Sequence, residues 1–296
     1  MLVEKEEKDN PVLYKYKKDM DQLYGAKVDD VDFDGDTSKI QTDVNQWVRS
    51  RTNGLIDSIM DSPPDPSTTA IILNAIYFKG TWVKSFDKQN TQRRKFVTRN
   101  FEKLDADFMT MKGDRFLYQK LPLAGEEVQV LEMPYASDSM SMVILLPSRT
   151  KGVQNMMSSE RFASEMETLL ANLNELLSKR VINLMIPKFK LQSEYSVIPT
   201  LEKMGIKHIF TPGSADLSGI NGRSDLVVSE VKHKAVVEVD EEGTEAAGGT
   251  FAAIQPPSVL VEPIRSIEFR VDHPFIFLIR DRVTGLLYFV GKVEAL

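Results

Sequence analysis

The residues that could do acid–base or metal chemistry are few and widely spaced in this chain. Its 296 residues include three histidines, His208, His233 and His273, and no cysteine. The histidines lack the spacing of a zinc protease, and neither a nucleophile-elbow motif nor a phosphate-binding glycine loop is present. Without cysteine there are no disulfides, thiol nucleophiles or cysteine-ligated zinc. We therefore expect no enzyme, metal site or cofactor, while a hydrolase built from scattered Ser, His and Asp stays open because geometry defines such triads.

Residues 30–35, with the sequence DVDFDG, resemble the start of a calcium loop, because carboxylates alternate and a glycine follows for the turn. The twelfth position of such a loop would be Gln41, which lacks the bidentate carboxylate that completes the site. Phe33 is better explained as the inward-facing residue at the end of a strand. We therefore favour a structural interpretation over calcium binding.

The segment 241–254, EEGTEAAGGTFAAI, follows a valine-rich run that predicts a strand over 226–239. Alternation with period two would place Thr244, Ala246, Gly248 and Thr250 on one face. That face is small and weakly polar, so the segment could stand in water as a loop or fit between two strands without overpacking. A flexible Gly/Ala linker is the alternative interpretation.

Several short motifs occur together along the chain. They are NAIYFKGTW at 74–82, DLSG at 216–219, HKA at 233–235, EEGTEAA at 241–247, DHPF at 272–275 and FVGKV at 289–293. In this order they resemble the serpin family, over residues 1–296. The resemblance implies an α+β single domain with a large central sheet rich in antiparallel pairs, two smaller sheets, surrounding helices and an exposed reactive loop.

The resemblance also implies a mechanism, in which a serine protease attacks the reactive loop, becomes acylated, and is trapped when the cut loop inserts into the central sheet as a new strand. It implies a hinge and reactive loop over 241–268. The hinge residues are Glu241, Gly243, Thr244, Glu245, Ala246, Ala247, Gly248, Gly249 and Thr250. Gly243 allows a bend, and the small residues 246–249 offer no bulk to oppose insertion.

Four residues match the cluster at which the family's central sheet opens: Asn74, Trp82, Lys188 and His233. The resemblance implies that Lys188 faces the hinge carboxylate Glu241. Alternation along the strand predicts that His233 lies on the buried face, with Lys232 and Lys234 on the other. Without the resemblance, His233 would be interpreted as a core histidine satisfied by one hydrogen bond.

The sequence does not single out one scissile bond. The family's usual spacing places it nominally between Pro257 and Ser258, where proline is a poor substrate for most serine proteases because its ring fixes the backbone. Leu260 would suit a chymotrypsin- or elastase-like protease and Arg265 a trypsin-like one, so the target stays open. The alternative function is a noninhibitory serpin that acts as a binding or carrier protein.

Composition limits the partners and the location. A net charge of -6 argues against nucleic acid as the main partner, since phosphate binding needs a concentrated basic face. The compact basic run 93–95 is better explained as a solvated strand edge than as a site for an anionic polymer. No apolar run approaches the length of a membrane span. We expect an extracellular, secreted protein, the family default, with the cytoplasm as the alternative.

Hydrophobic periodicity and turn signals predict the elements that position these residues. We expect helices over 10–25, 36–54, 161–179 and 197–205, strands over 28–33, 68–78, 181–191 and 226–239, and hairpins of 128–135 with 140–147 and of 269–280 with 286–293. Residues 2–5 resemble the end of a central-sheet strand. The resemblance thus implies a serpin domain over 1–296 that lacks its N-terminal helices and first strand.

Overall fold

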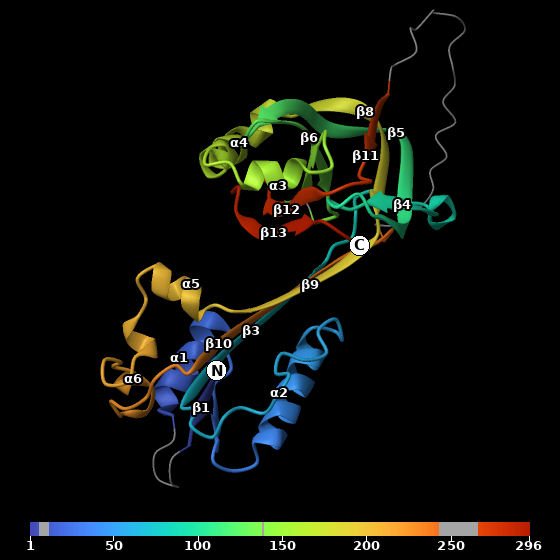
Figure 1. Ribbon diagram of the computed structural model, residues 1–296. Helices are drawn as coiled ribbons and strands as arrows, with labels where there is room; N and C mark the ends of the chain where they lie inside the picture. The colour runs from blue at the N-terminus through green and yellow to red at the C-terminus, as the bar shows by residue number, and fades with distance from the viewer. Residues whose placement is uncertain (6–11, 138, 243–265) are drawn as a thin grey trace, which may run out of the picture. The chain divides into compact units, whose positions relative to one another are not determined.

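The structure is a computed structural model that describes residues 1–5, 12–137, 139–242 and 266–296 (Figure 1). Its contacts divide the chain into two units, each described by itself. Unit 1 comprises Met1–Phe78 and Lys190–Val237, and unit 2 comprises Lys79–Phe189 and Glu238–Leu296. The chain combines helices with runs of mainly antiparallel strands, which confirms the predicted α+β class.

The helices are α1 (Tyr14–Tyr24), α2 (Thr37–Arg51), α3 (Gly152–Met157), α4 (Phe162–Leu176), α5 (Ile198–Lys203) and α6 (Ser218–Asn221), with the 3-10 turns η1 (Lys88–Asn90) and η2 (His208–Phe210). The strands are β1 (Leu2–Glu4), β2 (Asp29–Val31), β3 (Ala70–Lys79), β4 (Gln92–Val97), β5 (Lys103–Leu123), β6 (Glu126–Pro134), β7 (Met140–Pro147), β8 (Ser178–Pro187), β9 (Phe189–Ser196), β10 (Glu230–Val239), β11 (Ile267–Arg270), β12 (Phe275–Asp281) and β13 (Leu287–Val293).

The described strands form two sheets. The first has five strands in the order β2-β1-β3-β10-β9, and the second has the order β11-β8-β5-β6-β7-β12-β13, with β4 paired to β5 outside this path. β1 pairs with β3 in the five-stranded sheet, so residues 2–4 are a strand of this sheet, as predicted.

The ends of α1 and α2 follow from local chemistry. Gly25 ends α1 in the left-handed conformation at φ 60°, and its N–H donates to the carbonyl of Asp21. Asp36 caps α2, because its carboxylate accepts the backbone N–H of Lys39 at 3.0 Å. The helix predicted over 36–54 is therefore confirmed, with its end at Arg51.

The core of unit 1 lies between α2 and the five-stranded sheet. α2 runs alongside β1 and β3 in Figure 1. Val44 and Val48 of α2 share one hydrophobic cluster with Leu2, Ile71 and other strand residues. Phe33 belongs to the same cluster with none of its surface exposed, which confirms its inward orientation.

The core of unit 2 is formed by α3, α4 and the strands that they cover, β6, β7 and β12 (Figure 1). β6 and β7 form the predicted antiparallel hairpin, and β12 and β13 also pair antiparallel. The first arm of this second hairpin was predicted to begin at 269, but it begins at Phe275, because residues 267–270 form β11 and pair with β8. Phe277 of β12 lies opposite Gly291 of β13. A β-carbon at position 291 would approach the Phe277 ring to 2.4 Å, so glycine is needed for this contact.

Further predicted boundaries are wrong, among them the start of the strand expected over 226–239, which begins at Glu230. The single strand expected over 181–191 is two strands in different sheets, with the break at Lys188, whose N–H donates to the carbonyl of Asp107 at 2.8 Å. Apolar alternation continues across this break, so periodicity does not reveal it. The helix expected to reach Lys179 ends at Leu176, because Leu177 takes an extended backbone conformation and Lys179 belongs to β8.

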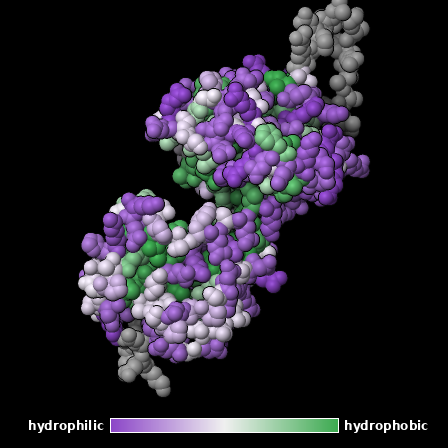
Figure 2. Space-filling model, in the orientation of Figure 1, coloured by the Kyte–Doolittle hydropathy of each residue, from purple (hydrophilic) through white to green (hydrophobic). Residues whose placement is uncertain are grey.

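Both units keep some apolar side chains at their surfaces (Figure 2). Leu23 and Tyr24 of α1 are largely exposed, as is Val290 of β13. Residues 93–95 are exposed on β4, which pairs with β5 alone among the described strands, so the basic run is a solvated strand edge as predicted. No helix within the described ranges has both the length and the apolarity that a membrane crossing requires.

Candidate functional site at the base of the hinge

The chain leaves β10 at Val239 and continues through Asp240, Glu241 and Glu242. We call these last three residues the hinge base. The remaining hinge residues, 243–250, lie outside the described residues, as do Pro257 and Ser258 of the nominal scissile bond. The residues that contact the hinge base belong, like the hinge base itself, to unit 2.

Glu241 is a buried carboxylate with a donor on each oxygen. Its exposed fraction is 4%. Lys188 Nζ lies 2.7 Å from Oε2, and the Thr91 hydroxyl donates to Oε1 at 2.7 Å. Burial opposes ionisation, but the hydrogen bonds from Lys188 and Thr91 outweigh it and lower the pKa of Glu241 below its ordinary value. The predicted contact between Lys188 and Glu241 is present, and the lowered pKa keeps the Glu241 carboxylate ionised at neutral pH.

The two donors are held by their local structure. Lys188 stands between β8 and β9, where its backbone N–H is bound to the carbonyl of Asp107 on β5. Thr91 follows η1, and its N–H donates to the carbonyl of Lys88. The Asp87 carboxylate accepts the N–H of Gln89 at the start of that turn. Side chains far apart in sequence thus reach one carboxylate from fixed positions.

The backbone of the hinge base is bound to the segment that begins at Trp82. The Trp82 N–H donates to the carbonyl of Glu242 at 3.0 Å, and its indole Nε1–H donates to the carbonyl of Asp240 at 2.9 Å. The Phe86 N–H donates to the carbonyl of Glu241 at 3.1 Å. Three consecutive carbonyls are therefore accounted for before the chain enters the hinge.

The Trp82 ring is itself fixed by packing. It is buried and stacks on Tyr135, with centroids 4.3 Å apart and ring planes inclined by 14°. The Phe86 ring meets it edge-on at 6.3 Å. Such stacking aims the indole N–H at the hinge base, so Trp82 combines a core role with a positioning role.

A second cation, Lys79, pairs with alternate carboxylates of the same segment. Its Nζ lies 3.0 Å from both Glu238 and Asp240 and 3.4 Å from Glu242. Hydrogen bonds with Asp240 and then Glu238 raise the pKa of Lys79 above its ordinary value, so it stays protonated. Sequence analysis missed Lys79 and Thr91. The spacing of 238, 240 and 242 on one strand face was a signal that a cation lay opposite.

The contacts of the hinge base are polar. They consist of ion pairs and hydrogen bonds to one strand end, and Lys188 and Lys79 keep part of their surface in water. The net free energy of each such contact is about 0.5–1.5 kcal/mol, and it is larger where a charged group takes part. Residues 240–242 are therefore held by polar contacts from unit 2.

Asn74 and His233 lie in unit 1, on the neighbouring strands β3 and β10. Within the described residues no hydrogen bond joins the two side chains. The His233 ring stacks on Tyr195 of β9, with centroids 5.9 Å apart and planes inclined by 16°. The function of both residues in sheet opening stays a prediction.

The predicted orientation of the lysines beside His233 is wrong. Lys234 is the buried residue, with 3% of its surface exposed, while His233 keeps an intermediate exposure. The reason is Glu194 of β9, whose carboxylate lies 2.9 Å from Lys234 Nζ. A paired charge can be buried where an unpaired one cannot. The alternation of polar and apolar residues therefore assigned Lys234 to the exposed face of the strand, although it lies on the buried one.

The acidic run 30–35 has a structural explanation. The Asp30 carboxylate accepts the N–H of Val12 at 2.7 Å and pairs with the ammonium of Lys17. Across the described parts of the chain, no group of three or more metal-ligating side chains is close enough to bind an ion.

Comparisons with known proteins identify the family. The profile of the serpin (serine protease inhibitor) family matches residues 6–296. Iripin-2 of Ixodes ricinus is 40% identical over 288 residues, which cover 96% of this chain and 68% of that protein. Intracellular coagulation inhibitor 1 of Tachypleus tridentatus is 32% identical, covering 96% of this chain and 66% of that one. The crystal structure of uncleaved ovalbumin superposes with a TM-score of 0.82 at 29% identity, covering 99% of this chain and 72% of ovalbumin. The chain belongs to the serpin family.

Proposed function

We propose that this serpin is an irreversible suicide-substrate inhibitor of a serine protease, which acts by loop cleavage and strand insertion into the five-stranded sheet. The observation that supports this most directly is the buried Glu241, held by Lys188 and Thr91 immediately before a run of small residues. In this proposal the reactive loop must stay in place before cleavage and move into the sheet afterwards. A strand end fixed by polar contacts suits the first requirement, and the small side chains that follow it suit the second.

The sheet order gives the insertion its geometry. β10 lies between β3 and β9, so a new strand beside β10 must separate it from one neighbour. The inserted strand then gains ladder hydrogen bonds along both edges. The state before cleavage persists because the barrier to this rearrangement is high, which makes it kinetically stable.

In this proposal the chain supplies no catalytic residue. The serine hydroxyl of the protease attacks the carbonyl carbon of the scissile bond, nominally Pro257–Ser258, and the amine of the following residue leaves. Asn74, Trp82, Lys188 and His233 act in sheet opening. The protease is chymotrypsin-, elastase- or trypsin-like, and the protein requires no cofactor.

An extracellular, secreted location is part of the same proposal. The relative from Tachypleus tridentatus is named as an intracellular inhibitor, so the cytoplasm is kept as the alternative. Fractionation of the source tissue, read with an antibody against this chain, decides between the two.

The test is to incubate the chain with chymotrypsin, elastase and trypsin and to separate the products on a denaturing gel. An inhibitor gives an adduct of serpin and protease that survives denaturation, and the mass of the released peptide locates the scissile bond. A protease whose serine has been blocked with phenylmethylsulfonyl fluoride is the control and should give no adduct.

A substitution in the hinge separates trapping from simple cleavage. Thr244→Arg adds bulk and charge to the segment that must enter the sheet, so we expect it to convert the inhibitor into a substrate. Thr244→Ser keeps the hydroxyl and should keep the adduct. An adduct that persists in Thr244→Arg at the original yield would contradict insertion.

A noninhibitory binding or carrier protein is the second candidate. The feature that favours it is Pro256-Pro257 beside the nominal scissile bond, because proline there resists most serine proteases. Cleavage without any adduct, by all three proteases and equally in Thr244→Arg, would favour this second function.

A further inference from the structure

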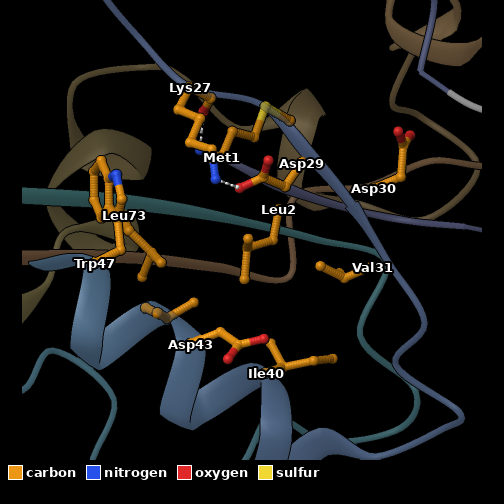
Figure 3. Close-up of a pocket in the computed structure, with 11 residues that line it drawn as sticks. Met1, Leu2, Lys27, Asp29, Asp30, Val31, Ile40, Asp43, Trp47 and Leu73 are labelled. Atoms are coloured by element: carbon orange, nitrogen blue, oxygen red, sulfur yellow. Dashed lines mark hydrogen bonds and ion pairs between the residues drawn. The ribbon is translucent and has the colours of Figure 1, made fainter.

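Unit 1 contains a cavity between α2 and the edge of the five-stranded sheet, at some distance along the chain from the hinge base. Its volume is about 310 Å³, which lies at the small end of the range for small-molecule sites. Residues from α2, β1, β2 and β3 line it. Figure 3 shows Trp47 and Leu73 at one end, Ile40 and Asp43 on the helix side, and Leu2 and Val31 on the strand side.

One part of the cavity wall is apolar, and the rest is polar or charged. Leu2, Val31, Val44 and Leu73 line it, and all four belong to the hydrophobic cluster that packs α2 on the sheet. These side chains come from regular elements, so the cavity is preformed. The apolar body of a ligand can therefore lie against this part of the wall.

Two polar groups of α2 that line this cavity lack partners among the described residues. Trp47 Nε1 is buried and donates no hydrogen bond. No hydrogen bond or ion pair joins the Asp43 carboxylate to any described residue. The two residues are separated by one helical turn, so their side chains are neighbours on one face of α2. A buried indole N–H without an acceptor costs free energy, which a bound acceptor would recover.

The other acidic side chains of the cavity are already neutralised. Asp29 lies 2.7 Å from Lys27 Nζ, and Asp30 is paired with Lys17. Asp43 is therefore the lining carboxylate that has no counter-ion within the described chain. Two cations also line the cavity, the ammonium of Met1 and Lys27, and both lie beside Asp29, across the cavity from Asp43 (Figure 3). At Asp43 itself a ligand carboxylate or phosphate would be repelled, whereas an ammonium would be attracted.

We propose that this cavity binds a small amphipathic amine. The apolar body of the ligand lies against Leu2, Val44 and Leu73. Its ammonium pairs with Asp43, beside the electron-rich face of the Trp47 indole. An oxygen acceptor on the ligand takes the hydrogen bond from Trp47 Nε1. The inference concerns binding alone and does not depend on protease inhibition.

The probe for this inference is tyramine, which has an aromatic body, an ammonium group and a phenolic oxygen. Titration of the full chain at neutral pH, followed by calorimetry or saturation-transfer NMR, should show saturable binding. Phenethylamine, which lacks the oxygen acceptor, should bind several-fold more weakly. The carboxylate analogue para-hydroxyphenylpropionate should bind at least about tenfold more weakly, a difference of about 1.4 kcal/mol.

Two variants assign the contacts. Asp43→Asn should weaken tyramine binding at least about tenfold and remove the preference for tyramine over its carboxylate analogue. Trp47→Phe keeps an aromatic ring but removes the N–H, so it should remove the preference for tyramine over phenethylamine. Asp57→Asn changes an exposed carboxylate that pairs with Arg49 outside the cavity, and should leave binding unchanged.

Circular dichroism of each variant establishes that it is folded. The proposal is overturned if the wild-type chain binds neither amine saturably, or if the carboxylate analogue binds as tightly as tyramine. It is also overturned if the folded Asp43→Asn variant binds tyramine as well as the Asp57→Asn control does.

Discussion

Lys188 and Glu241 form an ion pair of 2.7 Å at the point where the chain leaves β10 for the hinge. The carboxylate is buried, whereas 38% of the Lys188 side chain is exposed. The pair therefore joins a buried acceptor to a donor that is partly in contact with water. If the lysine is removed, the main cost in free energy should come from the buried Glu241 carboxylate, which loses a donor.

Lys188→Met tests this asymmetry. The variant leaves Glu241 buried with Thr91 as its remaining side-chain donor, and we expect a loss of about 1–2 kcal/mol in the free energy of unfolding, moderated because Lys188 is partly screened by solvent. Urea denaturation measures the loss. Lys190→Met, an exposed lysine two residues away, is the matched control and should change stability by less than about 0.5 kcal/mol. Equal losses in both variants would show that the pair contributes nothing specific.

The pH dependence of the hinge base follows from the lowered pKa of Glu241. Because the folded pKa lies below that of the unfolded chain, the pair stabilises the fold fully above the unfolded value of about 4.3, and this contribution is lost as the pH falls through the folded pKa. The difference in unfolding free energy between the wild-type chain and Glu241→Gln should therefore shrink between about pH 6 and about pH 3. Urea denaturation at each pH provides the measurement. A difference that stays constant over this range would show that Glu241 does not titrate with folding.

Trp82→Phe separates packing from hydrogen bonding at the hinge base. The phenyl ring can keep much of the contact with Tyr135, but the carbonyl of Asp240 loses its indole donor. We expect a loss of about 1–2 kcal/mol in unfolding stability and faster proteolysis at the start of the hinge. Trp82→Ala also removes the ring and should cost about 3–5 kcal/mol. Limited proteolysis and denaturation of both variants measure the two contributions, and equal proteolysis rates in Trp82→Phe and wild type would contradict a role for the indole N–H.

Periodicity and capping residues were enough to predict most elements of this fold. The cap at Asp36 and the glycine that ends α1 mark their helix ends by short-range chemistry, which a sequence displays directly. The resemblance to serpins added the contact between Lys188 and Glu241, which the structure contains.

The remaining parts depend on tertiary neighbours that no local pattern reveals. Thr91 is 150 residues from Glu241 in sequence, so its hydroxyl is recognised as a donor only in the fold. Lys234 is buried because Glu194 of a neighbouring strand neutralises it, whereas polarity alone places a lysine outside. The break at Lys188 is similarly a property of two sheets rather than of one strand.

A buried ion pair in unit 2 can be used to measure how much unfolding free energy is lost when one charge is left without its partner. Arg280 and Glu132 are 2% and 1% exposed, and their closest atoms are 3.0 Å apart. Arg280→Met leaves the carboxylate with Ser141 and the partly exposed Arg282, so we expect a loss of about 3 kcal/mol, at the lower end for a broken buried pair.

The double variant Arg280→Met, Glu132→Leu removes both charges and should be more stable than Arg280→Met alone. Urea denaturation of the two single variants and the double variant gives the coupling free energy between the two positions. Additive losses would show that the two side chains do not depend on each other.

The close approach of β12 and β13 predicts a strict requirement for glycine at position 291. A β-carbon there would lie 2.4 Å from two atoms of the Phe277 ring, which is itself buried and cannot move freely. Gly291→Ala should therefore lower the unfolding free energy by about 1–3 kcal/mol through overpacking. Gly219→Ala is the matched control, since a β-carbon at 219 meets no atom within 4 Å and the residue is helical, so this variant should be neutral or slightly stabilising. Thermal and urea denaturation of the two variants measure the difference. Equal stability would mean that the hairpin relaxes enough to admit a methyl group at the Phe277 contact.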